Sequence, residues 1–483
     1  MSDSTPRVST HTLPRSTALP KARQPPGRPP PRPYSQSNPK GIFFRIVLLG
    51  GVWFGFVASV VAQSYTFATI AGQAGISGSA DGTNNSAEFY QPAGLALDRA
   101  GNIYVADLLN HTIRKIMPAG TNWVVSTLAG LAGTNGFADG TNTQAQFDHP
   151  SGVVVDNAGN LFVTDSFNET IRKLTSVGAN WVVSTIAGVA GAAGSDDGTN
   201  SQARFHRPEA IAVDASGKLY VTDRLNNTVR EVSPVGTNWV VSTLAGVGGG
   251  LYGGFADGTN GDAEFNAPFG ISWHNGGNLY VADFGNNAIR RLSPIGPDWV
   301  TSTVAGFSGA TGTNDGLASD AKFNSPNGIA VDASGTLYVA DQFNDTIRKI
   351  EPVGSSWVVS TAGGQPLARG TNDGMGMNAR FYRPWGIAVD SARSLFVADE
   401  FNNTIRMGLP ASPSPVLHIR LGAGQVVLSW STTASNYVLE TAFALGPAAS
   451  WTARTNGVVL SGHDYVLTND VGLRPTFFQL RSP

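Results

Sequence analysis

Short apolar runs separated by turn residues follow one another along most of this chain. Within the segment 92–130, such runs lie at 94–98, 102–106, 111–116 and 123–128. Continuous runs of this length predict buried strands, and the alternation of polar and apolar residues in 111–116 predicts a half-exposed strand. No run has the spacing of an amphipathic helix. The pattern therefore predicts four short antiparallel strands joined by tight turns.

This four-strand unit occurs six times. The prolines that open the copies are 58 or 60 residues apart: Pro92, Pro150, Pro208, Pro268, Pro326 and Pro384. A fixed period of this size indicates a repeat architecture, and four antiparallel strands per repeat are typical of one β-propeller blade. A parallel solenoid is the competing fold, but its coils are usually shorter and lack three reversals per repeat. The sequence therefore predicts an all-β, six-bladed propeller with four-stranded blades.

The two ends of the repeat array complement each other. After Arg406 the sixth copy lacks its fourth strand, whereas a strand-like segment at 65–72 precedes the first copy. We expect 65–72 to complete the sixth blade, because this pairing covers both open sheet edges and ties the ends of the array together. The propeller is thus predicted over residues 63–409.

The repeat pattern P-x-G-I-A-V-D-x-x-G-x-L-Y-V-A-D-x-x-N-x-T-I-R-K resembles the NHL-repeat family of propellers. The resemblance covers residues 65–407 in six matching copies. The Asn-His pair of that family is kept only at Asn110-His111. In the other five copies the second residue is Glu169, Asn227, Asn287, Asp345 or Asn403. The resemblance supports the propeller fold, while a fold of this kind does not by itself define an activity.

The first 62 residues differ in composition from the repeats. Residues 1–45 are rich in proline and basic residues and have few large apolar side chains, which is typical of a disordered arm. Residues 46–62 are uncharged and apolar, with a length between those of a signal-peptide core and a membrane span. We expect a signal peptide cleaved after residue 62, which would make the protein secreted, periplasmic or attached to the cell surface. The alternative is an uncleaved membrane anchor with its basic arm inside.

The charge balance changes once this region is set apart. The chain of 483 residues has a formal net charge of −2 and no cysteine, so disulfides and thiolate metal sites are excluded. Residues 1–45 hold eight of the 32 basic residues and one of the 34 acidic ones, so the remainder carries about −9. A propeller that binds nucleic acid should show a basic face, so no nucleic-acid partner is predicted.

A second, smaller module follows the repeats. Residues 410–415 (Pro-Ala-Ser-Pro-Ser-Pro) predict a linker, and residues 416–483 return to strand-like alternation. The Val-Leu-Ser-Trp strand and the closing Phe-Phe-Gln-Leu-Arg are similar to those of fibronectin- or immunoglobulin-like modules. The resemblance implies a small β-sandwich-like module that attaches, spaces or presents the propeller, and no chemistry is expected in it.

Residues that recur in every copy are predicted to be structural. The Arg114-Lys115 pair and its counterparts are expected on a solvated outer strand face. The segment 81–84 (Asp-Gly-Thr-Asn) predicts a tight turn, and Phe89 is spaced to fill the core beneath it. A calcium site at such recurring carboxylates is the alternative, although it needs several oxygens around one ion. Asp98 and Asp107 end strands, which indicates turn geometry rather than catalysis.

The copies differ most beside the opening proline, just before the innermost predicted strand. These positions should surround one mouth of the central channel, where polar, charged and aromatic side chains can bind a sugar or a partner side chain. Ordinary variable loop surface is the alternative. The candidate ligand-binding residues are Tyr90, His149, His206, Arg207, Glu209, Phe269, Asn327, Tyr382, Arg383 and Trp385.

Two functions fit this sequence. The preferred one is a non-catalytic binding or scaffolding module for protein or glycan partners at the cell surface, without cofactor or metal, since no nucleophile, zinc or nucleotide motif is present. The alternative is an enzyme, because related propellers include lactonases and lyases that hold one divalent ion in the central channel. The ligands would then come from Asp148, His149, His206, Glu209, Asn266 and Asn327, with a metal-bound water or a nearby carboxylate as base.

Overall fold

The structure is a computed structural model that describes residues 64–248 and 253–411 and, further on, 418–422, 425–431, 438–442, 452–453, 458–461, 464–470 and 477–481. The predicted arm, the apolar segment 46–62 and most of the linker 410–415 lie outside these residues. The described residues form strands and short 3-10 helices, without an α-helix. None of their helices is long and apolar enough to cross a membrane. The strands fall into two compact units, β1–β30 and β31–β37.

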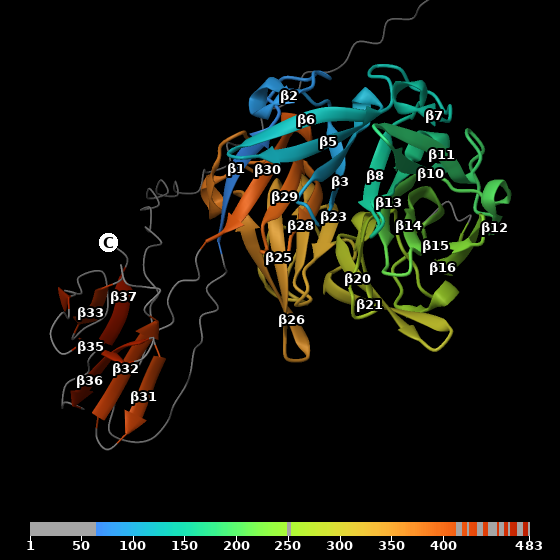
Figure 1. The fold of residues 1–483 in the computed structure, drawn as a ribbon. Coiled ribbons are helices and arrows are strands. Elements are labelled where there is room, and N and C mark those ends of the chain that lie inside the picture. The colour runs from blue at the N-terminus through green and yellow to red at the C-terminus, as the bar shows by residue number, and fades with distance from the viewer. Residues whose placement is uncertain are drawn as a thin grey trace, which may run out of the picture. The chain divides into compact units, whose positions relative to one another are not determined.

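The first unit consists of six antiparallel sheets, here called blades, which share one strand order (Figure 1). In the first blade the strands are β2 (Gly82–Thr83), β3 (Pro92–Leu97), β4 (Ile103–Asp107), β5 (Thr112–Ala119) and β6 (Asn122–Ala129). Their spatial order from the inside outwards is β3-β4-β5-β6-β2. The four strands that the sequence predicts in each repeat are therefore confirmed.

The other five blades repeat this order. The second blade comprises β7 (Gly140–Thr141), β8 (Pro150–Val155), β9 (Leu161–Asp165), β10 (Thr170–Val177) and β11 (Asn180–Gly188). The third comprises β12 (Gly198–Thr199), β13 (Pro208–Val213), β14 (Leu219–Asp223), β15 (Thr228–Val235) and β16 (Asn238–Ala245). The fourth comprises β17 (Gly258–Thr259), β18 (Pro268–Trp273), β19 (Leu279–Asp283), β20 (Ala288–Ile295) and β21 (Asp298–Gly306). The fifth comprises β22 (Gly316–Leu317), β23 (Pro326–Val331), β24 (Leu337–Asp341), β25 (Thr346–Val353) and β26 (Ser356–Gly363). The sixth comprises β27 (Gly374–Met375), β28 (Pro384–Val389), β29 (Leu395–Asp399), β30 (Thr404–Pro410) and β1 (Tyr65–Ala71).

Two series of single-turn 3-10 helices connect the strands. One series precedes the inner strands: η1 (Asn84–Ser86), η3 (Asn142–Gln144), η5 (Asn200–Gln202), η7 (Asn260–Asp262) and η10 (Gly376–Asn378). The other follows the second strand of each blade: η2 (Leu108–Asn110), η4 (Ser166–Asn168), η6 (Arg224–Asn226), η8 (Phe284–Asn286), η9 (Gln342–Asn344) and η11 (Glu400–Asn402). This second series forms the chain reversals that the sequence predicts after each Asp.

Each blade has five strands rather than the predicted four. The additional strand is only two residues long: β2 pairs with Val124 and Val125 at the outer edge of the first blade. The sequence predicts a turn at this place because two residues carry no recognisable strand pattern. The carboxylate of Asp81 holds the segment in position by accepting hydrogen bonds from the N–H and the hydroxyl of Thr127.

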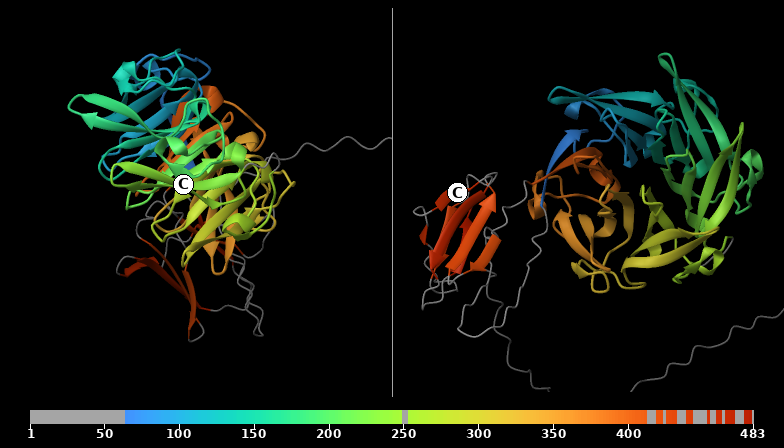
Figure 2. Two further views of the ribbon diagram at one scale, coloured as in Figure 1. Left: turned by 90° about the vertical axis from the view of Figure 1, so that its right-hand side faces the viewer. Right: turned by 60° about the horizontal axis from the view of Figure 1, so that its bottom comes forward.

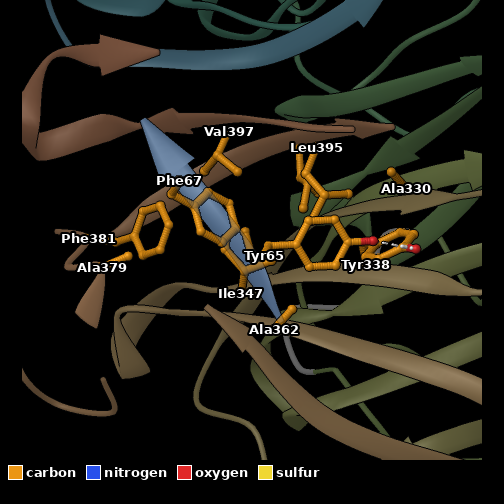
Figure 3. Close-up of a cluster of buried hydrophobic side chains, with 12 residues drawn as sticks. Tyr65, Phe67, Ala330, Tyr338, Ile347, Ala362, Ala379, Phe381, Leu395 and Val397 are labelled. Atoms are coloured by element: carbon orange, nitrogen blue, oxygen red, sulfur yellow. Dashed lines mark hydrogen bonds between the residues drawn. The ribbon is translucent and has the colours of Figure 1, made fainter. Parts of the chain in front are cut away.

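The N-terminal strand completes the sixth blade, as the sequence predicts. Strand β1 pairs antiparallel with β30, and its other edge pairs with β27. The side chains of Tyr65 and Phe67 enter the core between the fifth and sixth blades (Figure 3). There Phe67 contacts Phe381 edge to face, and the hydroxyl groups of Tyr65 and Tyr338 are 2.9 Å apart. The strand therefore closes one blade and also joins it to its neighbour.

The innermost strands of the six blades contact one another in a closed cycle, β3, β8, β13, β18, β23, β28 and back to β3. The ring of blades is seen in Figure 2. No strand of one blade is ladder-paired with a strand of another among the described residues, so side chains and close backbone contacts hold the cycle. The glycine two residues after the opening proline allows the backbones of neighbouring inner strands to come this close. A Cβ on Gly328 would lie 2.3 Å from the carbonyl oxygen of Trp385 in the next blade. This arrangement is that of a six-bladed propeller.

The recurring arginines are buried, so the predicted solvated strand face is wrong for them. Arg114 is fully buried, and its guanidinium contacts the carboxylates of Asp107 at 2.7 Å and Asp81 at 2.8 Å. It also donates to the carbonyl oxygen of Glu88 and lies 5.1 Å from the ring centre of Phe89. Phe89 is fully buried, which confirms it as a core anchor. Equivalent contacts surround Arg172, Arg230, Arg290, Arg348 and Arg406.

These contacts also explain the recurring carboxylates. Burial raises the pKa of Asp107 to about 6 and the neighbouring Arg114 opposes the shift, so Asp107 is ionised at neutral pH. Asp81, considered for calcium from the sequence, is engaged by Arg114 and Thr127. Asp98 accepts the N–H groups of Ala100 and Asn102, as a turn residue does. All three carboxylates are therefore structural.

The second unit contains two antiparallel sheets. The four-stranded sheet has the order β31 (His418–Gly422), β32 (Gln425–Ser431), β36 (Asp464–Asp470) and β35 (Val458–Ser461). The three-stranded sheet has the order β34 (Thr452–Ala453), β33 (Val438–Ala442) and β37 (Phe477–Arg481). The resemblance to a fibronectin- or immunoglobulin-like module remains a prediction.

Candidate binding face at the channel mouth

Two structurally equivalent positions in each blade lie at the same end of the central channel. The opening proline of each inner strand pairs with the Asp that ends the second strand, as Pro92 pairs with Asp107. The residue after the proline and the residue after the Asp contact each other through their side chains, as Ser151 contacts Ser166 and Glu209 contacts Arg224. We call this end of the propeller, with the loops around it, the channel-mouth face.

The residues that follow the proline line the channel. Ser151, Glu209, Phe269, Asn327 and Trp385 surround a cavity of about 70 Å³ together with backbone from all six inner strands. Four of the ten residues predicted from the sequence are thus brought together here: Glu209, Phe269, Asn327 and Trp385.

Sequence reasoning missed the neighbouring set, the residues that follow the strand-ending Asp. They are Leu108, Ser166, Arg224, Phe284, Gln342 and Glu400. They contact the channel residues directly: Ser166 lies against Ser151 and Glu209, and the ring centres of Phe284 and Phe269 are 4.5 Å apart. The sequence treats these positions as part of a turn, yet here too the copies disagree. The same criterion that selects the residues beside the proline would have found them.

Glu209 is the charged group of the channel wall. It is buried, and Arg224 approaches its carboxylate at 3.4 Å while the hydroxyl of Ser166 donates to it at 3.2 Å. Burial raises the pKa of Glu209, and Arg224 and Arg207 oppose this. Two blades further round the ring, the amide of Asn327 lines the cavity, and its Nδ2 has no hydrogen-bond partner among the described residues.

Glu400 is a second buried carboxyl group at this face. Its side chain receives a hydrogen bond from Nε2 of Gln342 at 3.0 Å. Burial raises the pKa of Glu400 to about 8, and the hydrogen bond from Gln342 and the charge of Arg383 counteract burial only partly. Glu400 is therefore mostly protonated at neutral pH.

The residues just before the proline have a structural task at the blade junctions. Their φ angles lie between 48° and 59°, and the backbone N–H of each donates to a side chain of the preceding blade. The acceptors occupy the position of the histidine in the family's Asn-His pair, and we call them junction acceptors. The pairs are His149 with His111, Arg207 with Glu169, Ala267 with Asn227, Ser325 with Asn287, Arg383 with Asp345, and Gln91 with Asn403. The last pair joins the sixth blade to the first.

Six predicted residues lie around the cavity rather than in its wall: Tyr90, His149, His206, Arg207, Tyr382 and Arg383. The backbone N–H groups of Tyr90, His206 and Tyr382 donate to the strand-ending Asp of their own blades. The side chains of the two arginines lie over aromatic rings. Arg207 is 3.7 Å from the ring centre of Phe167, and Arg383 is 4.6 Å from that of Phe343.

The structure does not assemble the ligand set of the alternative metal-dependent enzyme. Of its six residues, Glu209 and Asn327 line the described channel wall, and Glu209 already has Arg224 as a partner. Asp148 and His149 lie instead beside His111 at the junction of the first and second blades.

Comparisons with known proteins agree with this architecture. The chain is 28% identical over 338 residues to Protein SUPPRESSOR OF QUENCHING 1, chloroplastic, of Arabidopsis thaliana, a match that covers 65% of this chain and 30% of that protein. It is 29% identical over 307 residues to NHL repeat-containing protein 2 of Bos taurus, covering 57% and 40%. The chain thus spans less than half the length of these relatives.

Solved structures share the fold. A structural genomics protein of unknown function from Bacteroides thetaiotaomicron superposes with a TM-score of 0.54 at 20% identity, covering 72% of this chain and 76% of that one. An auxiliary nutrient binding protein from Bacteroides ovatus gives a TM-score of 0.54 at 17% identity, covering 72% and 78%. The model of the family described as NHL repeat matches residues 89–116 and 323–346, which belong to the first and fifth copies. The first and fifth copies are therefore identified as NHL repeats, and the other four copies share their sequence pattern.

Proposed function

We propose that this protein is a non-catalytic binding module that is exported or held at the cell surface and recognises a protein or glycan partner with its channel-mouth face. The observation that carries the proposal is the set of exposed aromatic rings layered with arginines around the channel. Phe167 is 41% exposed and Phe343 is 36% exposed, and an arginine lies over each ring. Aromatic and arginine side chains dominate the binding energy of protein interfaces.

We infer from the size of the channel that the partner contacts this face rather than the inside of the ring. Ligand pockets for small organic molecules usually measure 300–1,000 Å³. The channel cavity of about 70 Å³ is well below this range. The aromatic groups inside it are occupied with one another, since Phe269 contacts both Phe284 and Trp385. Phe167 and Phe343 lie outside the cavity, and their exposed edges can contact a partner.

The aromatic and arginine side chains around the cavity indicate which partners the channel-mouth face can bind. Tyr90 is 41% exposed, and Arg369 lies over the ring of Tyr382 at 5.0 Å. Guanidinium groups that lie over aromatic rings can donate to carboxylates, and exposed rings can stack on sugars. The face therefore suits an acidic protein segment or a glycan. Export rests on the apolar segment 46–62, and the fold shared with a nutrient-binding propeller is compatible with such a role.

The proposal is tested by screening the purified protein on a glycan array and in pull-downs from cell-surface extracts. A matched pair of variants distinguishes binding at the channel-mouth face from nonspecific binding to exposed apolar residues. Phe343 precedes β25 at the channel-mouth face, and Val353 ends the same strand at its other end with 51% exposure. We expect Phe343→Ser to weaken binding about ten-fold or more and Val353→Ser to leave it unchanged. Equal affinities of the wild type and Phe343→Ser would contradict the proposal.

A further inference from the structure

The junction of the first and second blades carries a cluster that the other junctions lack. His111, Asp148 and His149 each present a side-chain ligand atom, and these atoms all lie within 4.8 Å of one another. Nδ1 of His149 is 2.6 Å from Oδ1 of Asp148, and Nδ1 of His111 is 3.7 Å from the same oxygen. The two rings meet edge to face with their centres 4.9 Å apart. No other group of three such residues occurs among the described residues.

The scaffold does not require these residue types. His111 is the junction acceptor, and Asp148 and His149 are the second and the first residue before the opening proline. At the junction of the fourth and fifth blades they are Asn287, Asn324 and Ser325, and the same backbone bond forms, from Ser325 N–H to Asn287 Oδ1 at 2.8 Å. Amide and hydroxyl side chains are therefore sufficient to hold a junction together. The two histidines and the carboxylate of the first junction call for a different explanation.

We propose that His111, Asp148 and His149 form a binding site for a divalent metal ion of the zinc type. Two imidazoles and one carboxylate are a ligand set that such borderline ions prefer. Metal ligands at 2.0–2.2 Å from a tetrahedral ion are about 3.4 Å apart. The separations of 2.6 Å and 3.7 Å between the histidine Nδ1 atoms and Oδ1 of Asp148 bracket this value, and all three ligand atoms lie within 4.8 Å of one another.

The surroundings orient the ligands, and solvent reaches them. The ring of His149 stacks on Phe167 at 3.9 Å, which fixes the plane of the imidazole. The side chains of His111, Asp148 and His149 are 13%, 18% and 23% exposed, so the site is reached from solvent and keeps positions open for water or a ligand group of a partner. Nδ1 of His111 accepts the N–H of His149 at 3.1 Å. Coordination through this atom exchanges one neutral hydrogen bond for a metal bond, which is the stronger of the two.

The site lies on the channel-mouth face, because Phe167 belongs to the 3-10 helix η4 beside the channel. The proposal does not depend on the binding function proposed above. An ion here ties the second blade to the first through side chains of both.

The experiment is a titration of the metal-free, tag-free full chain with ZnCl₂ by calorimetry, with CoCl₂ as a spectroscopic probe. We expect one equivalent of zinc bound in the micromolar range or tighter, and visible absorption of the cobalt form. The fourth-blade junction supplies the variants: His111→Asn, Asp148→Asn and His149→Ser place its residues in the first junction. Because a sister junction folds with these residues, each variant should keep its thermal stability without zinc and lose at least 100-fold in zinc affinity.

The reverse exchange gives a gain of function. In the triple variant Asn287→His/Asn324→Asp/Ser325→His, the histidine at position 325 can stack on Phe343, as His149 stacks on Phe167. This triple variant should bind a second equivalent of zinc. The proposal is overturned if the wild type binds no zinc, or if His111→Asn and His149→Ser bind it with unchanged affinity. Either result would leave the cluster as a hydrogen-bonded junction only.

Discussion

Replacing Arg348 by Met tests whether the recurring arginines belong to the core. The guanidinium of Arg348 donates to Asp341 at 2.8 Å and to Asp315 at 2.7 Å, and it lies 5.0 Å from the ring centre of Phe323. The arginine and Asp341 are both fully buried. Methionine fills much of the same volume but leaves the Asp341 carboxylate without its cation.

The expected loss of stability follows from that burial. Removing one partner of a buried ion pair costs about 3–5 kcal/mol, because an uncompensated charge remains in the core. The second variant, Asp341→Asn with Arg348→Met, removes that charge and should recover about 1–3 kcal/mol. Burial already raises the pKa of Asp341, so protonation after loss of Arg348 limits the cost.

Urea unfolding followed by tryptophan fluorescence measures these differences as shifts of the midpoint at constant slope. The matched control is Arg99→Met. Arg99 is exposed and donates to Asn157 at 2.9 Å, so its loss should change the stability by less than about 0.5 kcal/mol. If Arg348→Met costs no more than this control, the buried network does not stabilise the blade and the argument fails.

Two further changes test the channel-mouth face and the contacts between blades. Glu400→Gln should remove a pH dependence: since burial raises the pKa of Glu400 from 4.5 to about 8, unfolding releases its proton between these values and stability falls as the pH rises across that window. Between pH 4.5 and pH 9, the free energy of unfolding of the variant should rise by up to about 5 kcal/mol relative to that of the wild type, as measured by urea unfolding. If the two proteins show the same pH dependence, this assignment is refuted. Gly328→Ala places a Cβ 2.3 Å from the Trp385 carbonyl and should cost about 1–3 kcal/mol in the same assay, whereas Gly261→Ala, with nothing within 4 Å, should be neutral. Equal stabilities of the two glycine variants would show that the blades can move apart without cost.

The sequence determined the repeat, the strands and the closing partner of the sixth blade. Strand positions follow from a local signal, the alternation and length of apolar runs, which survives in every copy. The pairing of β1 with β30 was predictable because the first and last copies lacked complementary pieces. The same comparison of copies located the channel-wall residues Glu209, Phe269, Asn327 and Trp385, since positions that scaffold constraints leave free are those that vary.

Only the tertiary structure decided the burial and partners of the charged groups. The sequence of the third strand alternates, and this pattern cannot tell a solvated arginine from one buried between two carboxylates that lie 7 and 33 residues away in the chain. The meeting of His111 with Asp148 and His149 likewise depends on the rotation between neighbouring blades, 37 and 38 residues apart in sequence. Local patterns report the environment of a strand face. Ion pairs, junction bonds and ligand clusters depend on how separate strands approach, and that geometry exists only once the ring is formed.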